Sequence, residues 1–270
     1  QGSRDGGLRY MGVDGDPVNR GWRCDRGRFN VEAGKGEHRV LQPLVREGDE
    51  LLPASWNTAL AAAAALITEA KAAGGVAGIA VIGGARGTNE DAFAWARVGH
   101  EVIGTPNVYS QMGDGLPVGL LGLDRATIDE AANATTIVLL GPDLKEELPV
   151  LYLRLRDAAA KQRSRIIELT PKHTGLTRNA WRSIGYEPGT QVAAVQGALA
   201  DGAIAAQLAK GNVVIVAGRA NLAESSAATI AALHALLAAV PGAKVLPAFR
   251  RGNAVGALQV GVRPGKGGLD

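Results

Sequence analysis

A single cysteine lies among arginines near the start of the chain. The stretch Trp22-Arg23-Cys24-Asp25-Arg26-Gly27-Arg28-Phe29 holds the one cysteine of the 270 residues. The thiolate is the form of cysteine that binds metal, and cationic neighbours favour it. One thiolate does not hold an iron–sulfur cluster, because such clusters usually take four protein ligands. Cys24 is therefore either an inert small hydrophobe or one ligand of a site whose other ligands lie outside this sequence.

Two glycine-containing loops that follow apolar stretches are the next candidates for chemistry. The loop Gly83-Gly84-Ala85-Arg86-Gly87 resembles a phosphate-binding glycine loop, but it lacks the acidic residue about 20 positions later that a nicotinamide site needs. This loop and Gly141-Pro142-Asp143 each lead into two acidic residues, which complement the helix dipole themselves. We interpret both as structural turns, with a nucleotide site compensated by Arg86 and Lys145 as the alternative.

A third loop, Thr170-Pro171-Lys172-His173-Thr174, is the best phosphate candidate of the three. It combines a cation, Lys172, with hydroxyl groups such as that of Thr170 in a tight turn. Lysine binds phosphate as a point charge, and a hydroxyl donates a hydrogen bond to a phosphate oxygen. Thr170 and Lys172 are therefore our candidate cofactor-binding residues in this part of the chain.

Alternating strand and helix patterns must position these loops. Five apolar strands separated by helices indicate an α/β fold with a doubly wound, mostly parallel sheet and helices on both faces. Ligands of such sheets bind beyond the carboxyl ends of the strands, where all three loops lie. The strands are expected at 78–82, 135–140, 165–169, 212–217 and 244–246. The helices are expected at 55–73, from 88, and at 145–161, 191–200 and 223–240.

Composition changes near residue 53. Residues 1–53, rich in Gly, Arg and Asp, predict a small antiparallel β-rich segment around the cysteine, and residues 54–270 predict the α/β region. That region forms one domain or two interleaved lobes, the second at about 125–190. The chain starts at Gln1 without a methionine and ends in a glycine-rich stretch. We therefore expect it to be an internal piece of a larger protein.

Eight motifs, in order along most of the chain, carry a resemblance. They are Pro17-Val18-Asn19, Cys24-Asp25-Arg26-Gly27-Arg28-Phe29, Pro43-Leu44-Val45-Arg46, Ser55-Trp56-Asn57-Thr58-Ala59-Leu60, Gly87-Thr88-Asn89-Glu90-Asp91, Gly104-Thr105-Pro106-Asn107, Gly141-Pro142-Asp143-Leu144-Lys145-Glu146-Glu147-Leu148-Pro149 and Arg250-Arg251-Gly252-Asn253. As a set they resemble the molybdopterin oxidoreductase superfamily. Within it, the chain is most similar to the large iron–sulfur subunits of bacterial NADH-quinone oxidoreductase, respiratory complex I.

The resemblance implies a role for Cys24. It matches the fourth ligand of a [4Fe–4S] cluster whose other three cysteines are expected upstream of Gln1. Arg26 stands where molybdenum relatives have a lysine between cluster and pterin, and a cation there favours the reduced, more negative cluster. Pairing of Arg26 with Asp25 or a backbone carbonyl is the alternative. The implied protein is an electron-transfer and scaffold subunit, and this piece is not expected to be catalytic by itself.

A molybdenum or tungsten enzyme of the formate dehydrogenase or nitrate reductase type is the second hypothesis. Its metal ligand is expected at Asp114, which also fits an ordinary Gly-Asp-Gly turn. Thr170 replaces an aspartate that often helps to hold the nucleotide part of the molybdenum cofactor in these relatives. We therefore expect molybdopterin to be absent. A structural interaction module without any cofactor is the third hypothesis.

Composition limits the possible partners. A net charge of +3 and few aromatic residues do not favour nucleic acid. No apolar run approaches the ~20 residues of a membrane helix, so we expect no direct membrane insertion. The resemblance implies the other subunits of the complex I peripheral arm as partners. It also implies a peripheral location on the cytoplasmic side of the cell membrane.

Overall fold

The structure, a computed structural model, describes residues 9–13, 15, 18, 20–30, 39–110, 116, 118–219 and 223–268. The chain forms two compact units. The first unit contains Gln1–Phe29 and Gly113–Arg250, and the second unit contains Asn30–Met112 and Arg251–Asp270. The division predicted between residues 53 and 54 falls inside the second unit. Cys24 belongs to the first unit.

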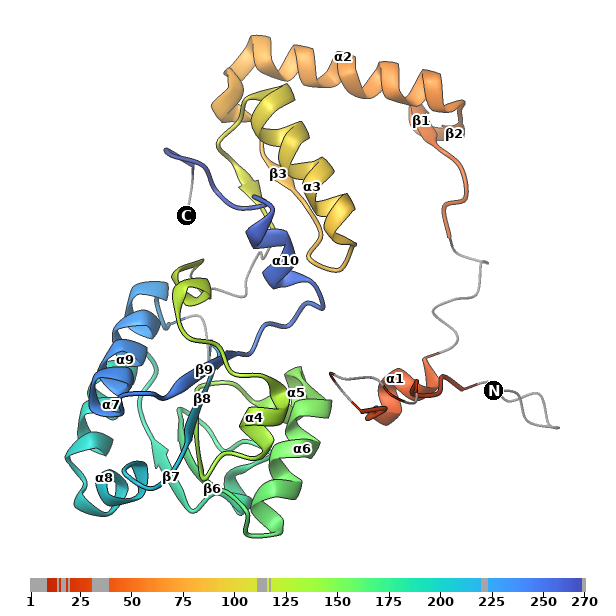
Figure 1. Cartoon of the computed structure of the whole chain (residues 1–270). Helices are drawn as coiled ribbons and strands as arrows, with labels where there is room; N and C mark the ends of the chain where they lie inside the picture. Colours follow the sequence, from red (N-terminus) through yellow and green to blue (C-terminus); the bar gives the residue numbers. More distant parts are fainter. Residues whose placement is uncertain are drawn as a thin grey trace, which may run out of the picture. The chain divides into compact units, whose positions relative to one another are not determined.

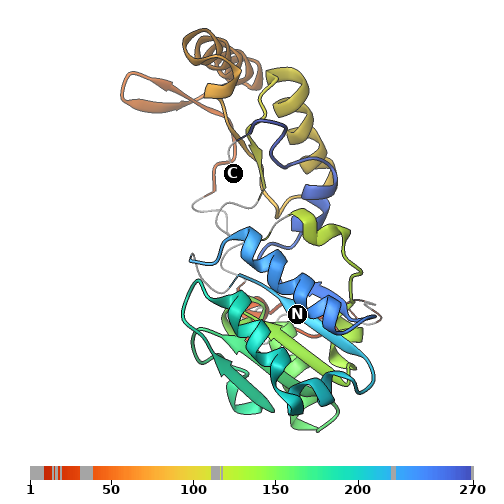
Figure 2. The same cartoon turned by 90° about the vertical axis from the view of Figure 1, so that its left-hand side faces the viewer.

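The first unit is built on a five-stranded parallel sheet with the strand order β7-β6-β5-β8-β9. Helices α4–α6 lie on one face and α7–α9 on the other (Figures 1 and 2). This confirms the predicted α/β class with a parallel sheet. Its strands are β5 (Thr136–Leu140), β6 (Arg165–Thr170), β7 (Arg182–Gly185), β8 (Val213–Ala217) and β9 (Lys244–Pro247).

The core of the first unit is apolar because its central strands are covered on both faces. Every residue of β5 and β8 is buried, as their unbroken β-branched and leucine-rich sequences predict. Side chains of Ile137 and Leu139 pack with Leu151 and Leu155 of α6. The strand order reverses between β5 and β8, so the loops that follow these two strands flank the usual ligand crevice of such sheets.

The helices predicted in the first unit are observed at or near the expected residues, and one of them is divided into two. The helix predicted at 191–200 is observed at the same residues, whereas the one predicted at 145–161 is two helices separated at Leu148. Pro149 opens the second of these, a position where its missing N–H is not needed. The α-helices are α1 (Asp25–Phe29), α4 (Ile128–Ala132), α5 (Leu144–Glu147), α6 (Pro149–Ala160), α7 (Gln191–Ala200), α8 (Gly202–Leu208) and α9 (Ser226–Ala239). Short 3-10 turns occur at η5 (Val118–Gly122) and η6 (Thr177–Asn179).

The second unit combines an antiparallel hairpin, a two-stranded parallel sheet and several helices. Its strands are β1 (Leu44–Glu47), β2 (Glu50–Pro53), β3 (Val81–Ile82) and β4 (Val108–Tyr109). Its helices are α2 (Trp56–Gly74), η3 (Val76–Gly78), α3 (Asn89–Arg97), the π-helix η4 (Val98–Ile103) and α10 (Ala254–Gln259). A Cβ on Gly99 would lie 2.5 Å from Val108 Cγ2, so glycine allows η4 to approach β4.

Two predicted elements have different partners from those expected. The strand predicted at 78–82 pairs with β4 in the second unit and is not part of the five-stranded sheet. The place of a fifth strand is taken by β7, which the sequence did not predict because its residues are mostly exposed. The antiparallel hairpin expected in the first 53 residues is present as β1 and β2. The hairpin belongs to the second unit, whereas Cys24 belongs to the first, where it directly precedes helix α1.

Candidate functional site

Cys24 begins a short helical turn. The backbone N–H of Arg28 donates to the Cys24 carbonyl at 3.0 Å, so the cysteine carbonyl receives the first hydrogen bond of α1. The thiol is half-buried, and its Sγ lies 3.9 Å from where a Cβ on Gly27 would be. The thiol is accessible enough to bind a ligand, and the turn fixes where its sulfur lies.

The charged neighbours of Cys24 are arranged around this turn. Arg26 is exposed, and Arg28 is partly buried. Among the described residues the buried Nε of Arg28 has no hydrogen-bond partner, although it lies 4.0 Å from Asp25 Oδ1. Asp25 thus lies within ion-pair distance of Arg28, and the pairing of Arg26 stays a prediction. The turn thus places the positive charges of Arg26 and Arg28 close to the cysteine in the sequence.

An arginine–aspartate network attaches the cysteine segment to the sheet of the first unit. Arg20 approaches Asp129 of α4 with two nitrogens, Nη2 at 2.7 Å and Nε at 3.0 Å from Oδ2. Arg154 of α6 also donates to Asp129, and its Nη1 lies 3.4 Å from the Val18 carbonyl. The two guanidinium groups, Arg20 first, lower the pKa of Asp129 from 3.8 to about 2. Asp129 therefore stays ionised and bound to both arginines at neutral pH.

Residues from the two ends of the cysteine segment lie close together. Arg20 has φ +52° and Gly21 has φ +73°, so two successive residues adopt the left-handed conformation. A Cβ on Gly12 would lie 2.5 Å from the Gly21 carbonyl oxygen, which explains the glycine there. The N–H of Tyr10 donates to the Arg28 carbonyl at 2.9 Å. Tyr10 and Arg28 thus lie side by side, and Arg20 holds this part of the chain to helix α4.

The two predicted loops of the first unit lie together at the carboxyl edge of the sheet. Asp143 accepts from the N–H of Lys145 at 3.2 Å and from the N–H of Gly175 at 3.3 Å. A Cβ on Gly175 would lie 2.6 Å from the Lys145 Cβ, so the loops that follow β5 and β6 touch. Asp143 caps α5, as the structural-turn interpretation expects.

The hydrogen-bonding groups of the loop after β6 are used within the protein. The Thr170 hydroxyl, which is buried, donates to the Lys172 carbonyl at 3.0 Å. The Thr174 hydroxyl donates to Glu168, and the Thr174 N–H donates to the Thr177 hydroxyl at 2.8 Å. The side chain of Lys172 is exposed. Of the groups that we expected to bind phosphate, the Lys172 ammonium is the one directed to solvent.

The crevice between β5 and β8 is narrow where their loops begin. A Cβ on Gly218 would lie 2.7 Å from the Pro142 Cβ, so the proline ring fills the space beside Gly218. Further along the loop after β8, Glu224 is buried beside the segment that follows β7: its Oε1 accepts from the Gly189 N–H at 2.6 Å, while Oε2 has no partner among the described residues. Sequence reasoning did not identify Glu224. A phosphate placed beside Gly218 would meet a proline ring, which donates no hydrogen bond.

The remaining predicted site residues lie elsewhere. The glycine loop 83–87 belongs to the second unit, where Thr88 and Asp91 form a capping box at the start of α3. Asp114 lies outside the described residues. The described part of the chain contains no group of three or more His, Cys, Asp or Glu side chains placed to hold a metal ion. Any metal site that includes Cys24 would therefore need ligands from outside the described residues.

The three side chains of the anchoring network, Arg20, Asp129 and Arg154, were missed by sequence reasoning. Thr127 and Glu130 form a capping box at the start of α4, a signature that the sequence does carry. It predicts a helix beginning with an exposed Asp129. It does not predict that Asp129 binds Arg20, which is 109 positions away, or Arg154.

Comparisons with known proteins agree with this architecture. The family model described as Molybdopterin oxidoreductase matches residues 39–270. The G subunit of NADH-quinone oxidoreductase from Mycobacterium bovis is 32% identical over 95% of this chain and 32% of its own length. The Streptomyces coelicolor protein of the same name is 28% identical over 95% of the chain and 33% of its own length.

A third relative is named for a different activity. The NADPH-Fe(3+) oxidoreductase subunit alpha of Geobacter sulfurreducens is 29% identical over 70% of the chain and 23% of its own length. The chain thus spans about a third or less of the length of these curated relatives. The family model covers well over half of the 270 residues. This chain therefore belongs to the molybdopterin oxidoreductase family.

Proposed function

We propose that the chain is part of the large iron–sulfur subunit of a respiratory NADH-quinone oxidoreductase. In this proposal the subunit passes electrons through a [4Fe–4S] cluster, and its molybdopterin-oxidoreductase-like fold carries no pterin. The observation that carries it is similarity to the Mycobacterium bovis protein over 95% of the chain, together with a cysteine in a cationic turn. Because the chain spans a third of that relative, the activity belongs to the whole protein.

Cys24 supplies the fourth cluster ligand in this proposal. Its thiolate binds one iron, and three cysteines outside this sequence bind the others. When bound, the cluster accepts and releases single electrons. Arg26 and Arg28 place positive charge beside it, which stabilises the reduced state. Asp129 and Arg154 hold the cysteine turn in place through Arg20 and the Val18 carbonyl.

The geometry of the sheet loops supports the absence of a pterin. Donors of the loop after β6 are engaged by Glu168, the Lys172 carbonyl and Asp143. Pro142 fills the space beside Gly218 at the switch point of the sheet. We propose that this edge has a structural role. Thr170 and Lys172 remain the residues that a pterin nucleotide would contact if one binds.

The proposed partners are the neighbouring subunits of the peripheral arm of the complex, on the cytoplasmic side of the membrane. None of the helices in the described residues combines the length and the apolar character needed to cross a bilayer. We propose no nucleic-acid partner.

The decisive experiment replaces the cysteine in the full-length protein, purified with its partner subunits. Cys24→Ser is expected to remove one cluster, seen as a loss of about four iron atoms per subunit and of one electron paramagnetic resonance signal. Met11→Ser is the matched control. It removes a half-exposed sulfur from the same turn and is expected to leave the iron content unchanged. If every iron–sulfur signal survives in Cys24→Ser, the proposed ligand is wrong and the structural-module hypothesis gains support.

Elemental analysis of the same preparation tests the second hypothesis. Iron without molybdenum or tungsten is the expected result. Stoichiometric molybdenum or tungsten, with a guanine-containing pterin, would overturn the proposed absence of a pterin. In that case Asp114, Thr170 and Lys172 would be the first residues to replace.

A further inference from the structure

Strand β7 has one edge without a partner in the described part of the chain. It pairs with β6 on one side only and ends the sheet. In a parallel ladder, alternate residues direct both backbone groups to the same neighbour. The N–H of Trp181 donates to Ile166 of β6 at 2.8 Å. Two residues of the strand, Arg182 and Ile184, therefore direct their backbone N–H and carbonyl groups outward.

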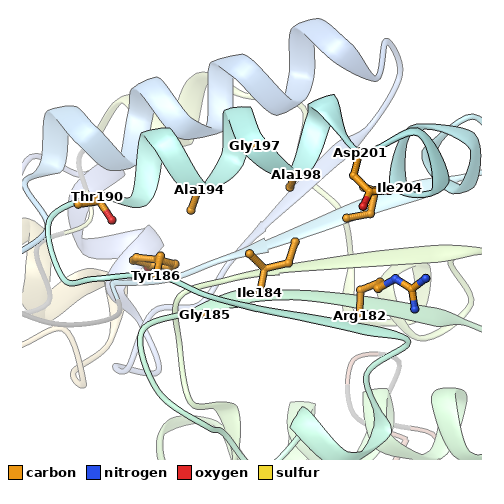
Figure 3. A pocket seen from close by; sticks show the side chains of 10 residues that line it. All are labelled: Arg182, Ile184, Gly185, Tyr186, Thr190, Ala194, Gly197, Ala198, Asp201 and Ile204. Carbon is orange, nitrogen blue, oxygen red and sulfur yellow. Dashed lines mark hydrogen bonds between the residues drawn. The ribbon is translucent and has the colours of Figure 1, made fainter.

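A groove runs beside this free edge. It has a volume of about 370 Å³ and lies between β7 and helices α7 and α8 (Figure 3). Two alternate residues of the strand, Arg182 and Ile184, and Tyr186 just after it contribute its floor. The helices contribute mainly small or apolar residues, among them Ala194, Gly197, Ala198 and Ile204. Small side chains on the helices leave space above the strand.

The groove is apolar in the middle and charged at one end. Ile184 points toward α7, and Arg182 lies at the end near Asp201 (Figure 3). Asp201 is occupied as the cap of α8, since its Oδ1 accepts from the N–H groups of Ala203 and Ile204 at 2.8 and 3.0 Å. The Arg182 guanidinium lies over the Trp181 ring, 4.5 Å from its centre, and donates to the Trp181 carbonyl at 3.4 Å. Within the described residues it is thus a cation that pairs with no carboxylate.

We propose that β7 binds an extended segment of another protein as a sixth strand of the sheet. Outward N–H and carbonyl groups beside an apolar groove are what an added strand uses, with its backbone giving affinity and its alternate side chains giving specificity. The segment carries an acidic residue next to Arg182 and, two positions away, a β-branched apolar residue next to Ile184. Opposite charges and apolar pairs across neighbouring strands are both stabilising.

A second copy of this chain fits the edge less well. Pairing two β7 strands would place one Arg182 near the other, and exposed cations on edge strands discourage such pairing. An acidic side chain on the added segment would instead be attracted to Arg182. The partner is therefore a different polypeptide with the pattern acid, any residue, valine or isoleucine, added parallel to β7 like the other strands of this sheet. The inference does not depend on the cluster or on Cys24.

The test uses the full-length protein and a fluorescent nine-residue peptide whose centre reads aspartate, threonine, valine. Gly197→Leu fills the groove, and an added Cβ at this position meets no atom within 4 Å, so the helix accepts it. Gly197→Ala is the matched control for helix propensity. We expect binding by the wild type and by Gly197→Ala, and at least tenfold weaker binding by Gly197→Leu.

A charge exchange tests the predicted register. Arg182→Glu should weaken binding of the aspartate peptide at least tenfold and should favour a peptide with lysine in place of the aspartate. In the wild-type complex, hydrogen exchange of the Arg182 and Ile184 amides should slow at least tenfold. No binding by the wild type, equal binding by both Gly197 variants, or unchanged exchange of these amides would overturn the inference. Dimerisation of the free protein that Gly197→Leu abolishes would also overturn it, because a second copy would then be the occupant.

Discussion

The buried carboxylate of Glu168 gives the most quantitative prediction. Glu168 is fully buried in β6 and receives hydrogen bonds from three hydroxyl groups of the segment that follows it. Thr177 Oγ1 donates to Oε2 at 2.8 Å, Ser183 Oγ donates to Oε2 at 2.9 Å, and Thr174 Oγ1 donates to Oε1. The directions are fixed for two of them, because Thr177 and Thr174 hydroxyls also accept from backbone N–H groups. Glu168 therefore holds the loop that contains Lys172.

At nearly constant volume, Thr177→Val removes one hydrogen bond to Glu168 and the hydrogen bond that the Thr177 hydroxyl accepts from the Thr174 N–H. A hydrogen bond to a charged group contributes about 1.5–3 kcal/mol, and one between neutral groups about 0.5–1.5 kcal/mol. The free energy of unfolding should therefore fall by about 2–4.5 kcal/mol. Ser183→Ala should cost less than Thr177→Val, because Ser183 is exposed and water can replace its hydroxyl. With a urea m-value of about 1–3 kcal/mol/M, the Thr177→Val midpoint falls by roughly 1 M or more.

Urea unfolding followed by tryptophan fluorescence measures these changes. Thr190→Val is the control, since the Thr190 hydroxyl is exposed and donates only to the Glu187 carbonyl among the described residues. It should change the free energy of unfolding by less than about 0.5 kcal/mol. If Thr177→Val costs no more than this control, Glu168 is not held by these hydroxyls, and the reasoning about the loop is refuted.

Three further predictions concern ionisable groups of the first unit. Asp129→Asn should release the turn that contains Arg20, seen as at least tenfold faster hydrogen exchange of the Arg28 amide. Hydrogen bonds from Lys244 and Thr127 lower the pKa of Glu130 from 4.5 to about 2, so its stabilisation is full above pH 4.5 and is lost as the pH falls toward 2. Glu130→Gln should flatten the dependence of Tm on pH in this range. Burial raises the pKa of Tyr186 from 10.0 to about 12, so stability should fall as the pH rises from 10 to 12, and less steeply in Tyr186→Phe.

Each of these predictions has a result that would contradict it. Unchanged exchange at Arg28 in Asp129→Asn would show that the anchoring network does not restrain the turn. Parallel Tm curves for wild type and Glu130→Gln between pH 2 and 4.5 would mean that Glu130 titrates alike in folded and unfolded chains. Equal alkaline unfolding of wild type and Tyr186→Phe would show that another group is responsible.

The elements that the sequence predicted well are those with strong local signals. Ser55 caps α2, as predicted, because its hydroxyl accepts from the Thr58 N–H at 3.1 Å. The central strands β5 and β8 were predictable from their unbroken apolar sequences. Strand β7 was not, since an edge strand buries little and its residues show no apolar run. Nor could the sequence show that residues 78–82 pair outside the main sheet, because an apolar run defines a strand but not its neighbour.

The candidate site residues also fall into two groups, those with a local signal in the sequence and those that depend on the folded backbone. Cys24 and its arginines stand out by residue type alone, and the Asp91 and Asp143 caps follow from local spacing. Contacts between residues that are far apart in the sequence cannot be recognised in this way. The contact between Arg20 and Asp129 and the engagement of the Thr170 hydroxyl by the Lys172 carbonyl depend on the folded backbone. No local pattern in the sequence encodes them.

The anchoring of the cysteine turn has a consequence for protein synthesis. Arg20 leaves the ribosome long before its partner Asp129, which lies 109 positions further along the chain. At a translation rate of about 5–20 residues per second, the cysteine turn waits roughly 5–20 s before its docking helix is made. During this interval Cys24 is exposed to the cell without its anchor. A cluster delivered while the chain is still growing would meet a mobile ligand, and one delivered after release would meet a fixed one.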